Sequence, residues 1–190
     1  MIKQLLFFSL SILIVSCGNN KKEEGQSQKE ILVENESIPE EEVPVLLGKQ
    51  EFDAIKKAPY DVWFDENYKY EPNKQTLDSL KLTLKGKSMV VFMGTWCSDS
   101  QLQVPILLNI LDRINYNTST IKLYMVSEDK DTPSGIEKEF EIEYVPTIIV
   151  YENEEEMGRI VEYPINSIEK DLLQITIGEE YKHAYYIEEE

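Results

Sequence analysis

The chain has 190 residues, of which 42 % are hydrophobic, so it is long and apolar enough for one globular domain with a sizeable core. Aspartate and glutamate number 36 against 19 lysines and arginines, which gives a formal net charge of −17 at pH 7. Because affinity for nucleic acid depends on cationic side chains that neutralise phosphates, this charge disfavours a nucleic-acid partner.

The first residues have the three parts of a secretory signal. Lys3 supplies the positive charge, residues 5–15 are an apolar run, and a serine then leads into Cys17. At about 1.5 Å per residue, a helix over residues 5–15 would be about 16 Å long, whereas a hydrocarbon core is about 30 Å thick. We therefore expect residues 1–16 to be a signal peptide rather than a membrane-spanning helix.

The sequence Ile14-Val15-Ser16-Cys17 at the end of this signal resembles the lipobox of bacterial lipoproteins. The resemblance implies that the Cys17 thiol is lipidated and becomes the first mature residue. Since several acyl chains hold a protein stably on a bilayer, it also implies a lipid anchor in a membrane. The expected location is the cell envelope, with the protein facing the periplasm or the cell surface. An ordinary cleaved signal and an uncleaved anchor are the alternatives.

Residues 17–42 are polar and charged, with few apolar residues. Such a segment cannot bury enough apolar surface to offset the entropy of ordering, so a disordered tether is expected. Within it, Lys21-Lys22-Glu23-Glu24 is similar to surface-export signals of some Bacteroidetes lipoproteins, with a solvated charge run as the alternative. The apolar spacing then changes, and we predict one domain over residues 43–180 followed by an acidic, tyrosine-rich tail over residues 181–190.

The domain is predicted to begin with three elements that precede its first central strand. Residues 49–58 are expected to form a short helix that ends at a proline, and the aromatic residues between 60 and 70 are expected to form a packed loop. An aromatic ligand groove is the alternative for that loop. Leucines spaced three and four apart predict a helix over residues 76–85.

A strand–helix–strand unit follows. Residues 88–94 are a continuous apolar run, which is typical of a strand covered on both faces. A helical pattern covers residues 97–114, and residues 121–127 are predicted to form the next strand. Ser134 and Glu137 then have the spacing of a capping box at the start of a short helix.

A strand–strand–helix unit completes the domain. Residues 147–151 are rich in β-branched side chains and are predicted to pair with residues 159–163 in a hairpin, around the acidic turn between them. The last helix is predicted over residues 166–177, with Asn166 and Glu169 at capping-box spacing. The two units together predict an α/β sandwich.

Cys97 lies where the buried strand passes into a helix, in the sequence Trp96-Cys97-Ser98-Asp99-Ser100. The start of a helix carries unpaired amide groups and a partial positive charge, which stabilise a thiolate and favour its nucleophilic reactivity. Asp99 opposes this effect, because it places a like charge nearby. Cys97 is therefore the candidate nucleophile of the chain.

The run from Phe92 to Ser100, together with Val145-Pro146-Thr147, resembles the thioredoxin superfamily, specifically the thioredoxin-like (TlpA/thioredoxin-type) lipoproteins of Bacteroidetes. The resemblance covers about residues 76–177. It implies a thioredoxin-like three-layer α/β/α sandwich, built from a β-α-β and a β-β-α unit, here with an N-terminal extension.

The same resemblance implies roles for individual residues. Trp96 and Cys97 match the tryptophan and the nucleophilic cysteine of the family's Trp-Cys-X-X-Cys motif, and Pro105 lies where the active-site helix of the family is kinked. Val145-Pro146-Thr147 matches the cis-proline turn, which in the family faces the cysteine and pairs with the backbone of a bound peptide.

Two departures from the family motif bear on activity. Ser100 stands at the position of the second, resolving cysteine, and Val91 stands where thioredoxins carry a buried acid. A mixed disulfide is released when a second thiolate attacks it, and Ser100 cannot supply one. Cys97 could form mixed disulfides or a sulfenic acid, but turnover would need an external thiol. The Ser100 hydroxyl could instead donate a hydrogen bond to the Cys97 thiolate.

These features leave three functions open. The first is a membrane-anchored protein whose single active-site cysteine acts in thiol–disulfide exchange or mixed-disulfide capture in the cell envelope, which would make it a monothiol oxidoreductase. Its partners would be envelope protein thiols or disulfides, or a low-molecular-weight thiol. The second is a redox-inactive binding module that uses the groove beside Pro146, and the third is a sensor of peroxide or disulfides.

No cofactor and no metal are expected. The chain has 1 histidine, and Cys97 is the one thiol left if Cys17 is lipidated, so a closed zinc site cannot be built from preferred ligands. Neither a phosphate-binding loop nor a dinucleotide-binding motif is present in the sequence.

Overall fold

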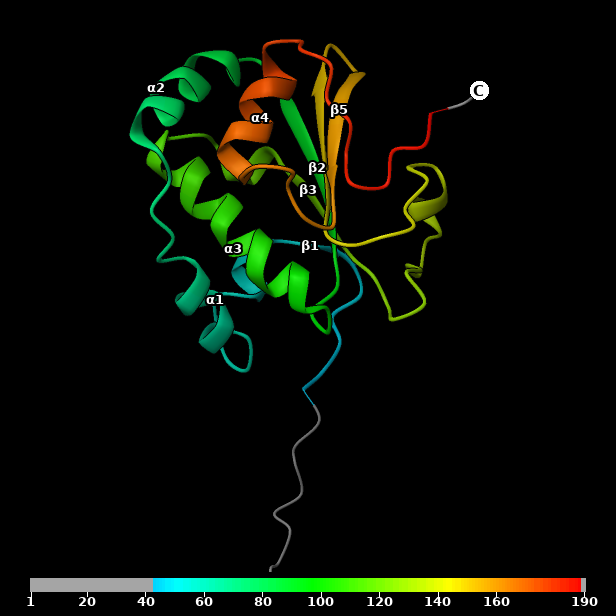
Figure 1. Cartoon of the computed structure of the whole chain (residues 1–190). Coiled ribbons are helices and arrows are strands. Elements are labelled where there is room, and N and C mark those ends of the chain that lie inside the picture. Colours follow the sequence, from blue (N-terminus) through cyan, green and yellow to red (C-terminus); the bar gives the residue numbers. More distant parts are fainter. Residues whose placement is uncertain (1–42, 189–190) are drawn as a thin grey trace, which may run out of the picture. The chain divides into compact units, whose positions relative to one another are not determined.

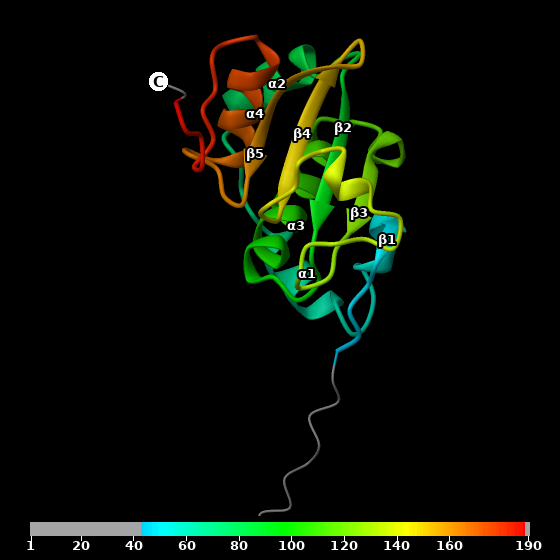
Figure 2. The ribbon, with the colours of Figure 1, turned by 90° about the vertical axis from the view of Figure 1, so that its right-hand side faces the viewer.

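A five-stranded sheet forms the centre of the computed structural model, which describes residues 43–188. The strands are, in chain order, β1 (Gly48–Gln50), β2 (Ser88–Met93), β3 (Lys122–Met125), β4 (Thr147–Glu152) and β5 (Glu155–Val161). Their order across the sheet is β1-β3-β2-β4-β5, as Figure 2 shows. β2 and β3 are parallel, and the other neighbouring strands pair antiparallel.

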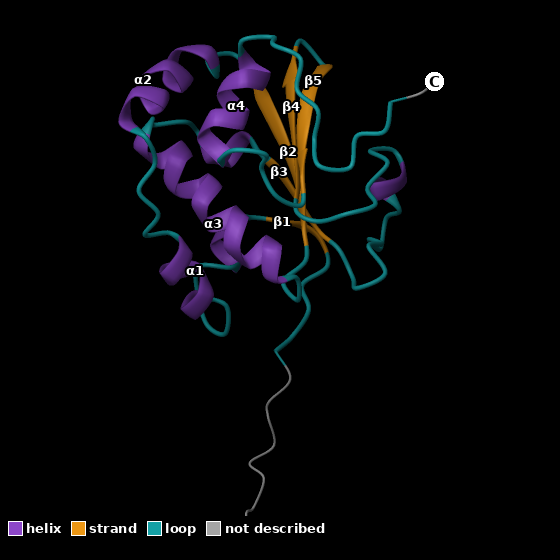
Figure 3. Ribbon diagram, viewed as in Figure 1, coloured by secondary structure: helices purple, strands orange, loops and turns teal. Residues whose placement is uncertain are grey.

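Within the described residues, four α-helices lie on one face of this sheet (Figures 1 and 3). They are α1 (Asp61–Asn67), α2 (Lys74–Thr83), α3 (Ser98–Arg113) and α4 (Ile168–Thr176). The other face is covered by the segment between β3 and β4, which contains the short 3-10 helix η3 (Ile136–Lys138). Two further 3-10 turns are η1 (Phe52–Ala54) and η2 (Thr118–Thr120). No helix in residues 43–188 is long and apolar enough to cross a membrane.

The apolar run of β2 is buried on both faces, because successive side chains of a strand point to opposite sides of the sheet. Met89, Val91 and Met93 pack in the large core beneath the helices. Val90 and Phe92 belong to a smaller apolar cluster on the opposite face, under the η3 segment. Full burial of such a side chain stabilises the folded state by roughly 1.5–3 kcal/mol. Because β2 contributes side chains to both clusters, it joins the two layers of the core.

The element order confirms the predicted α/β class. β2, α3 and β3 form the parallel β-α-β unit, and β4, β5 and α4 form the β-β-α unit. The short helix predicted after Ser134 is the 3-10 helix η3, so the layer on this face consists of η3 and its flanking loop. The predicted signal peptide, the predicted lipidation site Cys17 and the predicted tether lie outside the described residues.

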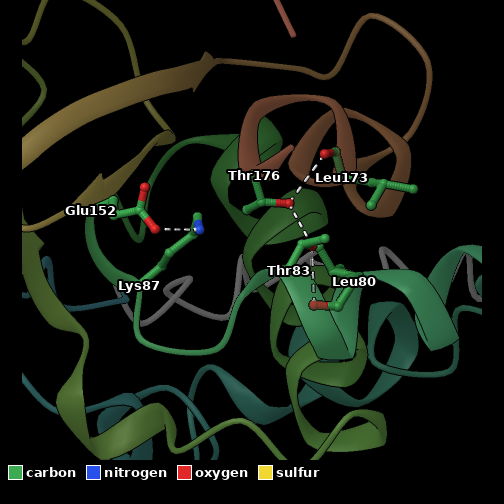
Figure 4. Close-up of polar contacts among 6 residues, drawn as sticks. All are labelled: Leu80, Thr83, Lys87, Glu152, Leu173 and Thr176. Atoms are coloured by element: carbon green, nitrogen blue, oxygen red, sulfur yellow. Dashed lines mark hydrogen bonds and ion pairs between the residues drawn. The ribbon is translucent and has the colours of Figure 1, made fainter. Parts of the chain in front are cut away.

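Figure 4 shows how the end of α2 is joined to α4 and to β4. The hydroxyl oxygens of Thr83 and Thr176 are 2.8 Å apart, and the Thr176 hydroxyl also donates to a carbonyl of its own helix. Lys87, which follows α2, donates to the carboxylate of Glu152 at the end of β4, with 2.8 Å between nitrogen and oxygen. These polar contacts fix two helices and the sheet at the end of the core far from Cys97 along β2.

The short helix predicted over residues 49–58 is wrong. Gly48–Gln50 forms β1, which pairs antiparallel with β3, and only the 3-10 turn η1 follows it. A segment this short has little intrinsic helical stability, whereas an unpaired edge of β3 offers backbone hydrogen bonds. Tertiary pairing therefore decides the conformation.

The packed aromatic loop predicted over residues 60–70 is also wrong, since α1 occupies its middle. Tyr60, Phe64 and Tyr68 are spaced by four residues, which is the helical period that the prediction missed. Tyr60 and Phe64 are buried, and Phe64 stacks on Tyr68 with ring centroids 5.4 Å apart. The aromatic residues thus pack in the core, and the alternative of an aromatic ligand groove is not supported.

The predicted capping box pairs Glu137 with Ser134, and this prediction is wrong because Glu137 bonds to Thr132 instead. The Glu137 carboxylate accepts hydrogen bonds from the backbone N–H of Thr132 at 3.0 Å and from its hydroxyl at 2.7 Å. The residue that precedes η3 is Gly135, whose φ of 72° is left-handed and suits glycine. The partner of Glu137 is therefore two residues earlier in the chain than the sequence spacing indicated.

The predicted capping box of Asn166 and Glu169 is wrong as well. Ser167 precedes α4, and its side chain makes no capping bond. The backbone N–H of Asn166 donates to Asp171 at 3.2 Å, while Glu169 accepts a 3.3 Å hydrogen bond from the N–H of Asn73, just before α2. The acid at the predicted position is thus used to join two helices.

The hairpin turn is shorter than predicted. β4 runs to Glu152 and β5 begins at Glu155, so the turn consists of Asn153 and Glu154, with φ values of 51° and 71°. Two left-handed residues are typical of a type I′ turn, which matches the twist of the strands. The first residues of β5 are polar and exposed at the sheet edge, so no apolar pattern marked them as a strand.

Candidate functional site

Cys97 is the residue that precedes the first turn of α3. Its backbone N–H donates to the carbonyl of Gly94 at 3.1 Å, and its carbonyl accepts the N–H of Gln101 at 3.0 Å, so a tight turn carries the chain from β2 into the helix. The side chain is partly exposed. Its Sγ donates to the carbonyl oxygen of Val145, 3.2 Å away. Residues 48 positions apart in sequence thus meet at the thiol.

The segment that faces the thiol is the cis-proline loop, which we define as residues 144–147. The peptide bond between Val145 and Pro146 is cis, as the resemblance implied. The carbonyl of Pro146 accepts the backbone N–H of Glu162 at 2.7 Å, and the hydroxyl of Thr147 donates to the carbonyl of Tyr144 at 2.7 Å. The loop is therefore held from both sides, by Glu162, which follows β5, and by its own Thr147 side chain.

Trp96 folds back over the turn before Cys97. Its indole Nε1 donates to the carbonyl of Val126 at 3.0 Å, and Lys130 Nζ lies 5.8 Å from the ring centroid. The ring fits only because Gly94 has no side chain: a Cβ at that position would lie 2.5 Å from Cε2 and Nε1 of the indole. Gly94 is thus required by close packing, a role that the sequence did not reveal.

Ser100 is fully buried, and its hydroxyl oxygen accepts the backbone N–H of Gly94 at 3.2 Å. The expected hydrogen bond from this hydroxyl to Cys97 is not among those of the described residues, in which the thiol bonds to Val145. β2 ends one residue before Gly94, so that buried N–H needs an acceptor outside the sheet. The Ser100 hydroxyl oxygen therefore serves as an acceptor for the backbone at the end of β2.

The other predicted site residues lie around this turn. Ser98 is exposed and Asp99 is partly exposed in the first turn of α3. Val91, at the position of the expected buried acid, has no exposed surface and packs in the apolar core. The structure thus brings the residues of the Trp96–Ser100 segment and the cis-proline loop together.

The sequence of this region carries a family signature. A thioredoxin family model matches residues 71–174, which is more than half of the chain. The chain belongs to the thioredoxin family. Among curated proteins, the chloroplastic thioredoxin Y of Oryza sativa subsp. japonica is 28 % identical over 86 residues, or 44 % of this chain and 48 % of that protein. The chain thus spans about half the length of this curated relative.

Two solved structures are similar to this thioredoxin-family chain at low sequence identity. A protein of unknown function from Pseudomonas aeruginosa is 17 % identical, with a TM-score of 0.53 over 68 % of this chain and 93 % of that chain. Thioredoxin O2 from Arabidopsis thaliana, in the oxidized state, is 20 % identical, with a TM-score of 0.31 over 46 % of this chain and 74 % of that chain. The first similarity shows a shared fold and nothing about activity.

Asn67 supports α3 of this thioredoxin-family protein, although sequence analysis did not single it out. α3 continues through Pro105, which has no N–H to donate to the carbonyl of Gln101 four residues earlier. The side-chain amide of Asn67 donates to that carbonyl at 3.1 Å. The Gln101 side chain in turn donates to the carbonyl of Thr95 at 2.7 Å, next to the cysteine turn. Counting back four residues from Pro105 would have located the unpaired carbonyl.

Beside the cis-proline loop lies a groove of about 810 Å³. Its lining includes Tyr144 and Thr147 of the loop, Arg159 of β5, and His183 and Tyr185 of the C-terminal tail. Burial, followed by the nearby positive charge of Arg159, lowers the pKa of His183. Residues 43–188 contain no cluster of three or more histidine, cysteine, aspartate or glutamate side chains placed to hold a metal ion.

Proposed function

We propose that this thioredoxin-family protein uses Cys97 as a single active-site thiol for thiol–disulfide exchange or mixed-disulfide capture. The observation that carries the proposal is the position of its Sγ, partly exposed at the start of α3 and 3.2 Å from the carbonyl of Val145 in the cis-proline loop. A helix start favours the thiolate, which is the reactive form. Membership in the thioredoxin family supports thiol–disulfide chemistry on protein partners.

The proposed step is one exchange. The Cys97 thiolate attacks one sulfur of a partner disulfide, a new sulfur–sulfur bond forms, and the other partner sulfur leaves as a thiolate. Ser100 has no thiol and its hydroxyl is bonded to the backbone of Gly94, so the site cannot resolve this adduct by itself. A thiolate from a second protein or from a low-molecular-weight thiol attacks the partner's sulfur in this mixed disulfide, so that a disulfide forms between the partner and the incoming thiol and Cys97 leaves as a thiolate. The protein is therefore proposed to capture partners stably when no such thiol is present.

We further propose that the protein works in the cell envelope, held on a membrane by lipid on Cys17. The proposal is supported by the sequence Ile14-Val15-Ser16-Cys17 directly after an apolar run. The partners would be envelope protein thiols or disulfides, or a low-molecular-weight thiol. Replacement of Cys17 by serine is expected to move the protein from the membrane fraction to the soluble fraction and to abolish incorporation of labelled fatty acid. Unchanged fractionation and labelling would contradict the anchor.

The redox proposal is tested by trapping adducts of the full chain in cells. Thiols are quenched with an alkylating agent, and the protein is analysed on non-reducing gels with and without a reductant. The wild type is expected to form reductant-sensitive adducts that are absent from the Cys97→Ser variant. Ser98→Ala, which changes the exposed neighbour of the cysteine, is the matched control and should keep the adducts. Adducts that persist without Cys97 would rule out the proposed role.

An unreactive Cys97 would instead indicate a redox-inactive binding module. Native wild-type protein whose thiol fails to react with maleimide has no accessible Cys97, and the groove beside the cis-proline loop would then remain as its functional surface. The partial exposure of the Cys97 side chain favours reaction.

A further inference from the structure

We propose that Tyr185, in the C-terminal tail, is a positioning residue for the Cys97 site. The inference rests on the proposed function and adds a residue to it that lies far from Cys97 in sequence. Tyr185 contacts the cis-proline loop through its ring and the end of β5 through its hydroxyl. These are the two segments that determine where the carbonyl opposite the thiol lies.

The first contact is with the cis-proline loop. The ring of Tyr185 stacks on that of Tyr144, with centroids 3.9 Å apart and planes 13° from parallel. Tyr144 directly precedes Val145, whose carbonyl accepts the hydrogen bond of the Cys97 thiol. Tyr163 adds an edge contact to Tyr185, with a centroid separation of 6.3 Å. The tail therefore supports the loop within one residue of the atom that faces the thiol.

The second contact is with Glu162, which follows β5. The Tyr185 hydroxyl donates to the Glu162 carboxylate, and this hydrogen bond is the main cause of a raised pKa of the Tyr185 phenol. Glu162 has a φ of 63°, in the left-handed region that a residue with a side chain adopts at a cost. Its backbone N–H donates to the carbonyl of Pro146 at 2.7 Å. Tyr185 thus holds a strained residue in the conformation that pairs with the cis-proline loop.

The tail is itself held on the domain, so it can act as a support. The hydroxyl of Tyr181 donates to Asp171 of α4 at 2.8 Å, and the side chain of Gln174 donates to the carbonyl of Glu180 at 2.7 Å. The backbone N–H of Tyr185 donates to Nδ1 of His183 at 3.2 Å. The groove of about 810 Å³ between tail and loop stays open, which is expected of a support and not of a plug.

The test compares full-chain Tyr185→Ala and Tyr185→Phe with Tyr186→Ala. Tyr186 is the matched control, because it is a half-exposed tyrosine in the same tail whose ring contacts Lys182 and His183. Two properties are measured after thermal melts have shown that each variant is folded. The first is hydrogen–deuterium exchange, followed in peptides that cover residues 144–147 and the Glu162 amide. The second is the rate at which Cys97 reacts with each of two probes.

One probe is a peptide whose cysteine carries a 2-thiopyridyl disulfide, so that attack by Cys97 forms a peptide mixed disulfide and releases the pyridinethione. The other is iodoacetamide, which needs no groove. In Tyr185→Ala, the Glu162 amide should exchange about fivefold faster or more, because its hydrogen-bond partner is less well held. The peptide rate should fall roughly three- to tenfold, the size expected for loss of one stacked aromatic pair. The iodoacetamide rate should stay within about twofold.

Tyr185→Phe retains the stack and should lie between the wild type and Tyr185→Ala in both exchange and peptide rate, while Tyr186→Ala should match the wild type. Unchanged exchange and peptide rate in Tyr185→Ala would overturn the proposal. So would a faster peptide rate, since the tail would then obstruct the groove. If the wild type reacts with neither probe, the proposed function fails, and the exchange data alone still decide whether Tyr185 positions the loop.

Discussion

The hydroxyl of Ser100 accepts a hydrogen bond from the backbone N–H of Gly94, 3.2 Å away, at the position where the family motif has its second cysteine. Ser100 is fully buried, so this bond satisfies a backbone donor that water cannot reach. The thiol of Cys97 is bonded elsewhere, to the carbonyl of Val145. The serine therefore has a structural role in the turn, and the candidate site has one sulfur.

Ser100→Cys is expected to give the protein activity in an insulin reduction assay with dithiothreitol, which the wild type should lack. Residues three apart at the start of a helix have Cβ atoms about 5–6 Å apart, close enough for a disulfide after a small adjustment. The new thiol can then attack the mixed disulfide on Cys97 and release the partner. Ser100→Ala is the control and should gain nothing. Robust insulin reduction by the purified wild type would contradict the single-thiol mechanism.

Gly94→Ala is expected to destabilise the protein by about 1–3 kcal/mol, measured by urea unfolding, because overpacking displaces the Trp96 indole. The added Cβ would lie 2.5 Å from the ring, and a displaced ring loses its hydrogen bond to Val126. Tryptophan fluorescence should shift as the indole moves. In a Trp96→Ala background the same substitution should cost less than about 0.5 kcal/mol, since the clash is gone. Equal costs in the two backgrounds would show that the indole is not the reason for the glycine.

Asn67→Ala is expected to cost about 1–2 kcal/mol of unfolding free energy, because the carbonyl of Gln101 loses its donor. Pro105→Ala restores a backbone N–H four residues after that carbonyl, so the cost of Asn67→Ala should shrink in the Pro105→Ala background. The measurement is a double-mutant cycle by chemical denaturation. Additive costs would mean that the asparagine acts only through its second bond, to the carbonyl of Trp63.

Thr132→Val is expected to destabilise the loop before η3 by about 1–2 kcal/mol at neutral pH. The Thr132 hydroxyl is the main cause of the lowered pKa of Glu137, whose ordinary value is 4.5. Since the pKa is lower in the folded chain than in the unfolded chain, the stabilisation is fully present above about pH 4.5 and is lost as the pH falls through the folded value. The difference between wild type and variant should therefore shrink at about pH 3, in unfolding curves recorded at both pH values. A difference that is constant with pH would exclude the carboxylate from this role.

The central elements could be predicted from the sequence because each has a local cause. The apolar run of β2 requires burial on both faces, and the change from strand to helix places Cys97 at a helix start. The short N-terminal elements could not be predicted, because β1 exists only as a partner of β3, and the acids Glu137 and Glu169 bond to residues outside the predicted caps. Polar side chains have several acceptors or donors within reach, and only the folded chain selects among them.

The α/β order of the domain, the candidate thiol after Trp96 and the serine at position 100 in place of a second cysteine could all be read from the order of the residues. Three contacts are visible only in the folded chain: the thiol with the carbonyl of Val145, the backbone N–H of Gly94 with the Ser100 hydroxyl, and the ring of Tyr185 stacked on Tyr144. Periodicity and helix starts depend on neighbours in the chain. The contacts of Cys97 with Val145 and of Tyr185 with Tyr144 instead join segments about 40 or more residues apart, which only the packing of β2, β4 and the tail brings together, and the Gly94–Ser100 bond forms only once α3 has turned back on the end of β2.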